Sequence, residues 1–210
     1  MYDRETGSLW SHVTGRAIRG PLAGTALTVL PAVHLTWREW RQLHPRGRVL
    51  VKEGRGGSRN VYDEYFSDPH RLGIFGTPNP DAILPGKEFV VGLVLGGQAV
   101  AYPFRRLSKQ PLVNDDASGV PVLVVFSQTD ASAVVFSRRV GNDLLTFTGL
   151  EQKAGVWQMR DRETGSLWRA LDGVALTGRY RGKRLDLLPA TRAFWFAWKG
   201  FHPTTRVWGE

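Results

Sequence analysis

The residues that first suggest chemistry are two copies of the octapeptide DRETGSLW, at positions 3–10 and 161–168. Each copy places a glutamate directly before a Thr-Gly-Ser turn. Two such loops could bring two carboxylates together, and carboxylates that share one proton in a shielded site can act as an acid–base pair in hydrolysis. However, Glu5 and Glu163 each follow an Asp-Arg pair rather than an apolar strand. This charged context favours a solvated turn with local ion pairs over a catalytic dyad.

Other polar residues with candidate roles are spread along the second half of the chain. Asn114 and Asp115 form an adjacent polar pair, Ser127 and Asp130 follow an apolar run, and His202 precedes a proline. An Asn-Asp pair is typical of a capped turn, and a histidine before proline is typical of a helix C-terminus, where imidazole interacts favourably with the helix dipole. These five residues are therefore weak catalytic candidates. Catalysis would require a fold that brings them into one pocket.

The composition excludes several kinds of site. The chain contains no cysteine, which excludes disulfides, thiolate metal sites and thiol nucleophiles. The histidines lack the ligand spacing of a zinc site, and the acidic residues Asp63, Glu64 and Asp68 lack the spacing of a calcium loop. Phosphate-binding, dinucleotide-binding and nucleophile-elbow motifs are missing from the sequence. The sequence therefore predicts no metal and no cofactor.

The octapeptide belongs to a longer repeat. At a constant offset of 158, residues 3–50 align without a gap to residues 161–208, and 22 of the 48 positions are identical. This repeat predicts a duplicated structural unit. Outside the octapeptide, the identical positions are rich in the residues of turns and packing: Gly15/Gly173, Gly20/Gly178, Gly24/Gly182, Leu30-Pro31-Ala32/Leu188-Pro189-Ala190, Trp37/Trp195, Trp40/Trp198 and His44-Pro45/His202-Pro203.

One short helix is predicted within the first copy. Residues 36–39 read TWRE, the spacing of a capping box, and the helix should run to about Leu43 before a His-Pro pair. Trp37 and Trp40 lie three residues apart and share one helix face. Aromatic residues at this spacing are typical of a core, so we expect both to be packing residues.

The second copy differs at the start of this helix. It keeps both tryptophans, but Phe194 replaces Thr36 and Ala197 replaces Glu39. The second helix therefore keeps its packing residues and loses its capping box.

Most of the remaining sequence predicts short strands. Apolar and β-branched runs are bounded by Gly, Pro and Asn-Asp clusters. Gly96-Gly97 predicts a two-residue hairpin turn. The run 122–126 is continuously apolar, so we expect it to be central and buried on both faces. The predicted strands lie at about 25–30, 89–95, 98–102, 120–126, 131–137, 144–148 and 156–159.

These patterns predict a mainly β fold with a few short helices. We expect an internally duplicated module, barrel-like or sandwich-like, whose first copy is incomplete. Residues 1–50 would form the C-terminal half of a first module, residues 51–85 a long irregular connection, and residues 86–210 a complete second module. Irregular connections of this length are often functional.

The charge distribution bears on partners. The net charge is +9, and residues 1–50 and 161–210 carry +4 each. A basic protein can bind nucleic acid, but basic runs and nucleic-acid motifs are missing, which favours an ordinary charged surface. Apolar stretches are too short to span a membrane, and Met1 opens on a polar turn rather than a signal peptide. Unpaired strand edges in an incomplete module predict some self-association.

The ordered motifs GKEFVVGLVLGGQAVAYPFRRL, VND, GVPVLVVF, LTF, GVWQMRDRETGSLW and LPATRAFWFAWKGFHP resemble the bacterial and archaeal family called domain of unknown function 3179. The resemblance covers nearly the whole chain. It implies a β-rich, internally duplicated fold and, often, an envelope or secreted setting, and it brings no assigned activity. Family members often carry Cys-Pro-x-Cys-Gly where this chain has SQTDA at 127–131, so thiol or soft-metal chemistry cannot be carried here.

The resemblance and the repeat together indicate where the chain begins. A complete earlier module would start well before Met1, and Met1 aligns with Met159, which lies inside a predicted strand. We therefore expect an internal methionine to serve as the start, and the chain to be the C-terminal part of a longer two-module protein.

Two functional hypotheses remain. The first is a non-catalytic, β-rich binding or structural module with an unknown ligand, because the repeat keeps residues of turns and packing. The alternative is the remnant of an enzyme or of a metal or redox protein whose reactive module lies in an N-terminal part outside this chain.

Overall fold

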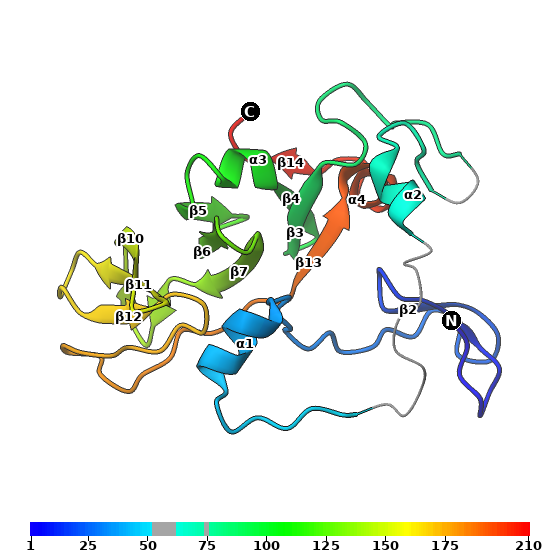
Figure 1. Cartoon of the computed structure of the whole chain (residues 1–210). Coiled ribbons are helices and arrows are strands. Elements are labelled where there is room, and N and C mark those ends of the chain that lie inside the picture. Colours follow the sequence, from blue (N-terminus) through cyan, green and yellow to red (C-terminus); the bar gives the residue numbers. More distant parts are fainter. Residues whose placement is uncertain (52–61, 74–75) are drawn as a thin grey trace.

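Short strands joined by glycine-rich turns make up most of the molecule, and three sheets lie in a row across it (Figure 1). The structure is a computed structural model that describes residues 1–51, 62–73 and 76–210. In chain order the elements are β1 (Leu9–Ser11), β2 (Arg16–Arg19), α1 (Trp37–Leu43), α2 (Asp63–Ser67), β3 (Phe89–Leu95), β4 (Gln98–Pro103), α3 (Phe104–Leu107), β5 (Leu112–Ala117), β6 (Val120–Ser127), β7 (Ser132–Ser137), β8 (Arg139–Val140), β9 (Asp143–Leu144), β10 (Phe147–Lys153), β11 (Val156–Asp161), β12 (Leu167–Arg169), β13 (Ala190–Phe194), α4 (Trp195–Phe201) and β14 (Arg206–Val207).

The middle sheet has the strand order β5-β6-β7, with antiparallel pairing throughout. Its central strand β6 is buried on both faces, since every residue from Val122 to Phe126 is at most 3% exposed. Successive strand residues point to opposite faces, so β6 contributes side chains to two separate cores. The prediction that this run is central and doubly buried is confirmed.

One face of the middle sheet packs against a four-stranded sheet of order β13-β3-β4-β14. Within that sheet, β3 and β4 form the predicted hairpin, and both Gly96 and Gly97 have the positive φ that its two-residue turn requires. The two sheets form a sandwich. Its core combines Val91, Leu93, Val100 and Tyr102 from the four-stranded sheet with Val113, Val122, Val124 and Phe126 from the middle sheet.

The other face of the middle sheet packs against the three-stranded sheet β10-β11-β12 and the turns that follow it. This second core combines Leu123, Val125, Val134 and Phe136 with Phe147, Met159, Trp168 and Leu185. The fold is therefore mainly β with short helices and sandwich-like layers. Among the described residues none of the sheets closes into a barrel, so the barrel-like alternative is wrong.

The two seven-residue helices have different surroundings. In α4, Trp195 and Trp198 are 0% and 2% exposed because they pack against the four-stranded sheet. In α1, Trp37 is 55% exposed and stacks on Trp40 with 5.1 Å between ring centroids. The prediction that both α1 tryptophans are core residues is wrong: no sheet of the described chain covers Trp37, and Trp40 is half-buried and belongs to none of the three cores.

The first fifty residues contain fewer strands than predicted. β1 and β2 form a two-stranded hairpin, and Ala26 makes one bridge to Arg16. The strand predicted at 25–30 is otherwise wrong, because residues 28–30 make no backbone hydrogen bond to another part of the described chain.

The predicted irregular connection at 51–85 contains one short helix, α2. Its positions 52–61 and 74–75 lie outside the described residues. Across the part that is described, no helix is long and apolar enough to cross a membrane.

Candidate functional site

Helix α1 brings a buried carboxylate onto the middle sheet. The helix starts as the sequence predicts: Thr36 Oγ1 accepts a hydrogen bond from the Glu39 amide at 3.3 Å, and Glu39 Oε2 accepts one from the Thr36 amide at 3.0 Å. The capping box is confirmed. It also fixes the Glu39 side chain, which is only 2% exposed, against the end of the β6–β7 hairpin.

Two serines at that hairpin end face the helix. Ser127 and Ser132 are paired across the two strands, and strand alternation places them on the same face as Val125 and Val134. This is the face of the second core, against which residues of the α1 region pack. The Ser132 hydroxyl donates a hydrogen bond to Glu39 Oε2 at 2.6 Å, and both serines are at most 2% exposed.

The polar cluster contains unpaired atoms. Within the described chain, Glu39 Oε1 and Ser127 Oγ are buried and have no hydrogen-bond partner. Leaving such a group unpaired costs about 1–3 kcal/mol. Beside them, the Asp130 side chain is 6% exposed and lies 4.0 Å from the Arg38 guanidinium. A carboxylate beside a hydroxyl can hold a proton or orient a water molecule, so this cluster has the groups for acid–base chemistry.

A cavity of about 400 Å³ lies between the α1 region and the turns that follow β12. Its walls are mainly apolar. The polar side chains among the lining residues are His44, Asp172, Arg184 and Asp186. The remaining lining residues are Val33, Leu35, Trp40, Leu43, Phe136, Leu171, Leu185 and Leu187.

The polar groups of this cavity differ in their freedom to bind a ligand. Asp172 is held by Arg169, whose Nε and Nη2 donate to its two carboxylate oxygens at 2.8 and 2.5 Å. This pairing raises the pKa of Arg169. The Arg184 guanidinium and the Asp186 carboxylate have no hydrogen bond or ion pair within the described chain. One cation and one anion therefore remain available at the rim.

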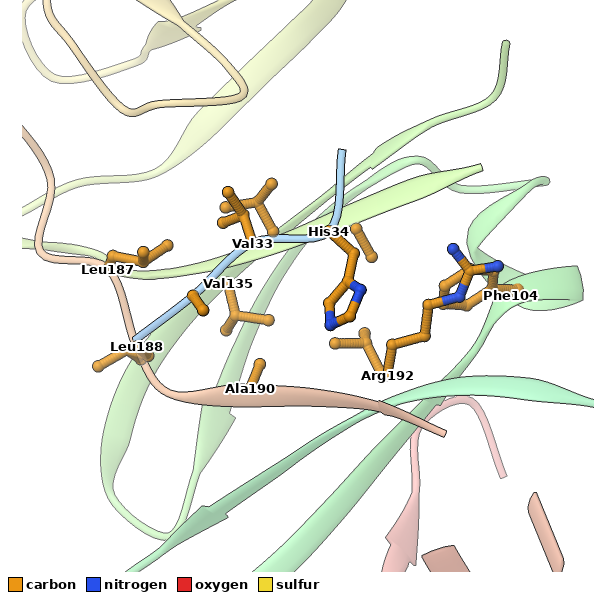
Figure 2. Close-up of a pocket in the computed structure, with 12 residues that line it drawn as sticks. Val33, His34, Phe104, Val135, Leu187, Leu188, Ala190 and Arg192 are labelled. Carbon is orange, nitrogen blue, oxygen red and sulfur yellow. The ribbon is translucent and has the colours of Figure 1, made fainter. Parts of the chain in front are cut away.

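A much smaller cavity, about 10 Å³, lies beneath residues 32–34, where they cross β7 and β13 (Figure 2). His34 and Arg192 lie side by side at one end of it. The Arg192 guanidinium lies over the rings of Phe89 and Phe104, at 4.3 and 5.1 Å from their centroids. Partial burial lowers the pKa of Arg192. This volume suits one water molecule, so the larger cavity is the better candidate for an organic ligand.

The five predicted site residues fall in three separate places. Asn114 has a structural role, since its side chain donates to the Phe147 carbonyl at 2.9 Å and accepts from the Phe147 amide at 2.8 Å. Its neighbour Asp115 accepts hydrogen bonds from Tyr102 and Arg206 at 2.9 and 2.6 Å. Burial, together with the Asp115 charge, raises the pKa of Tyr102. This pair therefore fastens strands together.

The other three predicted residues are divided between two elements. Ser127 and Asp130 lie in the hairpin that faces α1. His202 is the C-cap of α4 and packs on Trp198 with 4.2 Å between ring centroids, and burial lowers its pKa. The helix-end interpretation of His202 is confirmed, as it is for His44.

Sequence reasoning missed two parts of the site. The TWRE spacing predicts only a capping role for Glu39, and the one signal of a further role is that the second copy has Ala197 at the equivalent position. The large cavity had no local signal, because its lining residues come from segments far apart in the chain.

In both octapeptides the aspartate, rather than the glutamate, makes most of the side-chain hydrogen bonds. In the second copy Asp161 accepts hydrogen bonds from the Trp168 indole at 2.8 Å and from the Thr164 amide at 2.6 Å. Asp161, the last residue of β11, is 1% exposed, whereas Arg162, Glu163 and Gly165 of the turn are exposed, so the expected solvated turn holds for the glutamate and not for the aspartate. Glu163 accepts a hydrogen bond from the Thr146 amide at 2.9 Å. These contacts explain the motif as a folding element.

Groups of three or more His, Asp or Glu side chains that could hold a metal ion do not occur among the described residues. In comparisons with known proteins, residues 1–205 match the family model described as "Protein of unknown function (DUF3179)". No curated protein and no solved structure matches the chain.

Proposed function

Because this chain belongs to the DUF3179 family, whose description assigns no function, we propose from the site itself that it is a non-catalytic binding module. Its ligand is a small, largely apolar molecule held in the cavity beside α1. The observation that carries this proposal is a cavity of about 400 Å³ with apolar walls and a few polar groups at its rim.

The size and lining of the cavity support a small organic ligand. Small-molecule pockets usually enclose about 300–1,000 Å³ and combine apolar walls with a few orienting polar groups. Here the Trp40, Leu43 and Leu187 side chains supply apolar contact, while Arg184 and Asp186 offer one group of each sign. A ligand with an apolar body and one or two hydrogen-bonding groups fits this distribution.

Thermal unfolding of the full chain tests the proposal. The probes are medium-length aliphatic acids and alcohols and bicyclic aromatic acids. A probe present at 100 times its Kd stabilises the folded state by about 2.7 kcal/mol. Leu43→Trp fills the cavity and should weaken binding at least about tenfold, whereas Leu144→Trp, on an exposed residue outside the cavity, should not. Equal binding by both variants, or no stabilisation by any probe, overturns the proposal.

A second candidate function is enzymatic. The Glu39–Ser132 contact is the observation that supports it. In that case the Glu39 carboxylate would act as the base toward Ser132 or a water molecule. The test is hydrolysis of a panel of activated esters by the wild-type chain, Glu39→Gln and Ser132→Ala. Turnover that both substitutions abolish without unfolding would favour this candidate, and turnover insensitive to them would discard it.

We also infer that the chain self-associates through unpaired strand edges. The hairpin β1–β2 is a sheet of only two strands, and exposed edges invite pairing between molecules. Light scattering on the purified 23.5 kDa chain measures this directly, and a monomer at all accessible concentrations would contradict it.

A further inference from the structure

The segment from Thr28 to Leu35 is an extended chain that is paired with no strand, although its residues 32–34 cross β7 and β13 (Figure 1). Residues 28–34 are exposed, with Val29 at 58% and Leu30 at 78%. Within the described residues, no backbone amide or carbonyl of Thr28–Leu35 takes part in a hydrogen bond. Such a segment presents unpaired main-chain groups to the solvent, and another strand can pair with them.

The equivalent segment in the second copy shows how these residues pair when a partner is present. At the offset of 158, Thr28 and Leu30 correspond to Asp186 and Leu188. The Asp186 carbonyl accepts from the Ser137 amide at 2.9 Å, and the Leu188 amide donates to the Val135 carbonyl at 2.9 Å.

After these residues, the chain of the second copy joins the four-stranded sheet. The next residues form β13, which pairs antiparallel with β3 over its whole length. The same stretch that is unpaired in the first copy is therefore a paired strand in the second.

The composition of the unpaired segment fits an interface. Residues 20–37 contain no Asp, Glu, Lys or Arg. The equivalent residues 178–195 contain five basic residues and one acidic residue. In a chain with a net charge of +9, two copies repel one another unless they meet through surface without charge. This segment provides an exposed, apolar surface of that kind.

We propose that two copies of this chain dimerise by antiparallel pairing of their Thr28–Leu35 segments. The inference rests on the self-association proposed above and names the surface responsible. Charge favours a second copy as the occupant, because the first copy lacks the arginines and lysines that its equivalent carries.

The position of Pro31 determines the register. Proline has no amide hydrogen, so its backbone nitrogen must face away from the partner strand. In an antiparallel pair, alternate residues form hydrogen bonds to the same neighbour. If a twofold axis passes between the two Ala32 residues, the amides of Leu30, Ala32 and His34 donate to the partner strand. Pro31 then faces away from it. In this register the Leu30 amide donates to the partner strand, just as the amide of its equivalent, Leu188, donates to β7.

Light scattering on the full chain tests the interface. We expect the wild type to have twice the 23.5 kDa chain mass and Leu30→Lys to raise the dimer dissociation constant at least tenfold, because it places a charge within the uncharged strand pair, opposite His34 of the other copy. Leu144→Lys adds the same charge to another exposed residue, on β9, and should leave the dimer intact.

Cross-linking tests the register. The chain has no cysteine, so Ala32→Cys introduces a single thiol, and a short bismaleimide should join two copies. Thr204→Cys, at an exposed residue outside the segment, should remain uncross-linked. A dimer that persists in Leu30→Lys, or that Ala32→Cys fails to cross-link, overturns this inference but leaves self-association intact. A monomeric wild type overturns both.

Discussion

The two copies of DRETGSLW make the same local contacts in very different surroundings. In both, the aspartate accepts from the tryptophan indole at 2.8 Å and from the threonine amide at 2.6 Å. Their apolar neighbours differ, since Leu185 is 1% exposed and its equivalent Leu27 is 52% exposed. The octapeptide therefore encodes a turn by itself, while burial of the neighbouring leucine depends on sheets supplied from elsewhere in the chain.

The helices extend the same comparison. In the second copy, α4 contributes two buried tryptophans to the core behind the four-stranded sheet. In the first, α1 exposes Trp37 and instead buries Glu39. Thus the first copy has less apolar cover than the second and makes a polar contact with the middle sheet, and both candidate binding features involve its residues.

Truncating the tryptophan of each octapeptide should have the most unequal effects on stability. Trp168→Ala should lower the free energy of unfolding by about 3–5 kcal/mol, because the indole is fully buried in the second core. Trp10→Ala should cost less than half as much, since it belongs to none of the large cores. Urea unfolding followed by circular dichroism measures both. Equal losses would show that the local turn, rather than its cover, dominates stability.

A second prediction concerns Glu39, the carboxylate that α1 buries. Glu39→Ala removes the Glu39 half of the capping box, in which Oε2 accepts from the Thr36 amide, and also removes the Ser132 contact, so we expect a loss of about 2 kcal/mol in unfolding free energy. The matched variant is Ser132→Ala, which leaves the cap intact and should cost less. Urea unfolding distinguishes the two contributions. A neutral Glu39→Ala would indicate that the unpaired Oε1 atom cancels both contacts.

The third prediction is a small pH dependence of the melting temperature, caused by Asp3 of the first octapeptide. Hydrogen bonds from Trp10 and Thr6 lower the pKa of Asp3 from 3.8 to about 2. A carboxyl whose folded pKa is lowered contributes stability above its unfolded pKa, and this contribution is lost as pH falls from about 4 toward 2. Asp3→Asn should therefore flatten the melting temperature profile in that interval. An unchanged slope would show that the Asp3 contacts do not persist in solution.

Local patterns in the sequence predicted local structure well. The paired glycines at 96 and 97 specify their hairpin, the TWRE spacing specifies α1, and the unbroken apolar run of β6 indicates burial on both faces. Each of these signals depends on residues within a few positions of one another.

Features that depend on distant segments could not be predicted. Residues 25–30 have the composition of a strand, but strand formation also needs a neighbour, and in the described chain β2 provides one only as far as Leu27. In the same way, the partner of Glu39 is Ser132, 93 positions away, and the cavity beside α1 is lined from residues 33 to 187. No local periodicity encodes such distances.

The double burial of β6 has a consequence for how the molecule opens. Because its alternate residues belong to the two cores on either side, neither outer sheet can separate from the middle sheet without exposing part of this strand. The amides of Val122–Phe126 should therefore exchange with solvent only through global unfolding and be the slowest in the chain. Through this one strand, the layers on both sides should melt as a single cooperative unit.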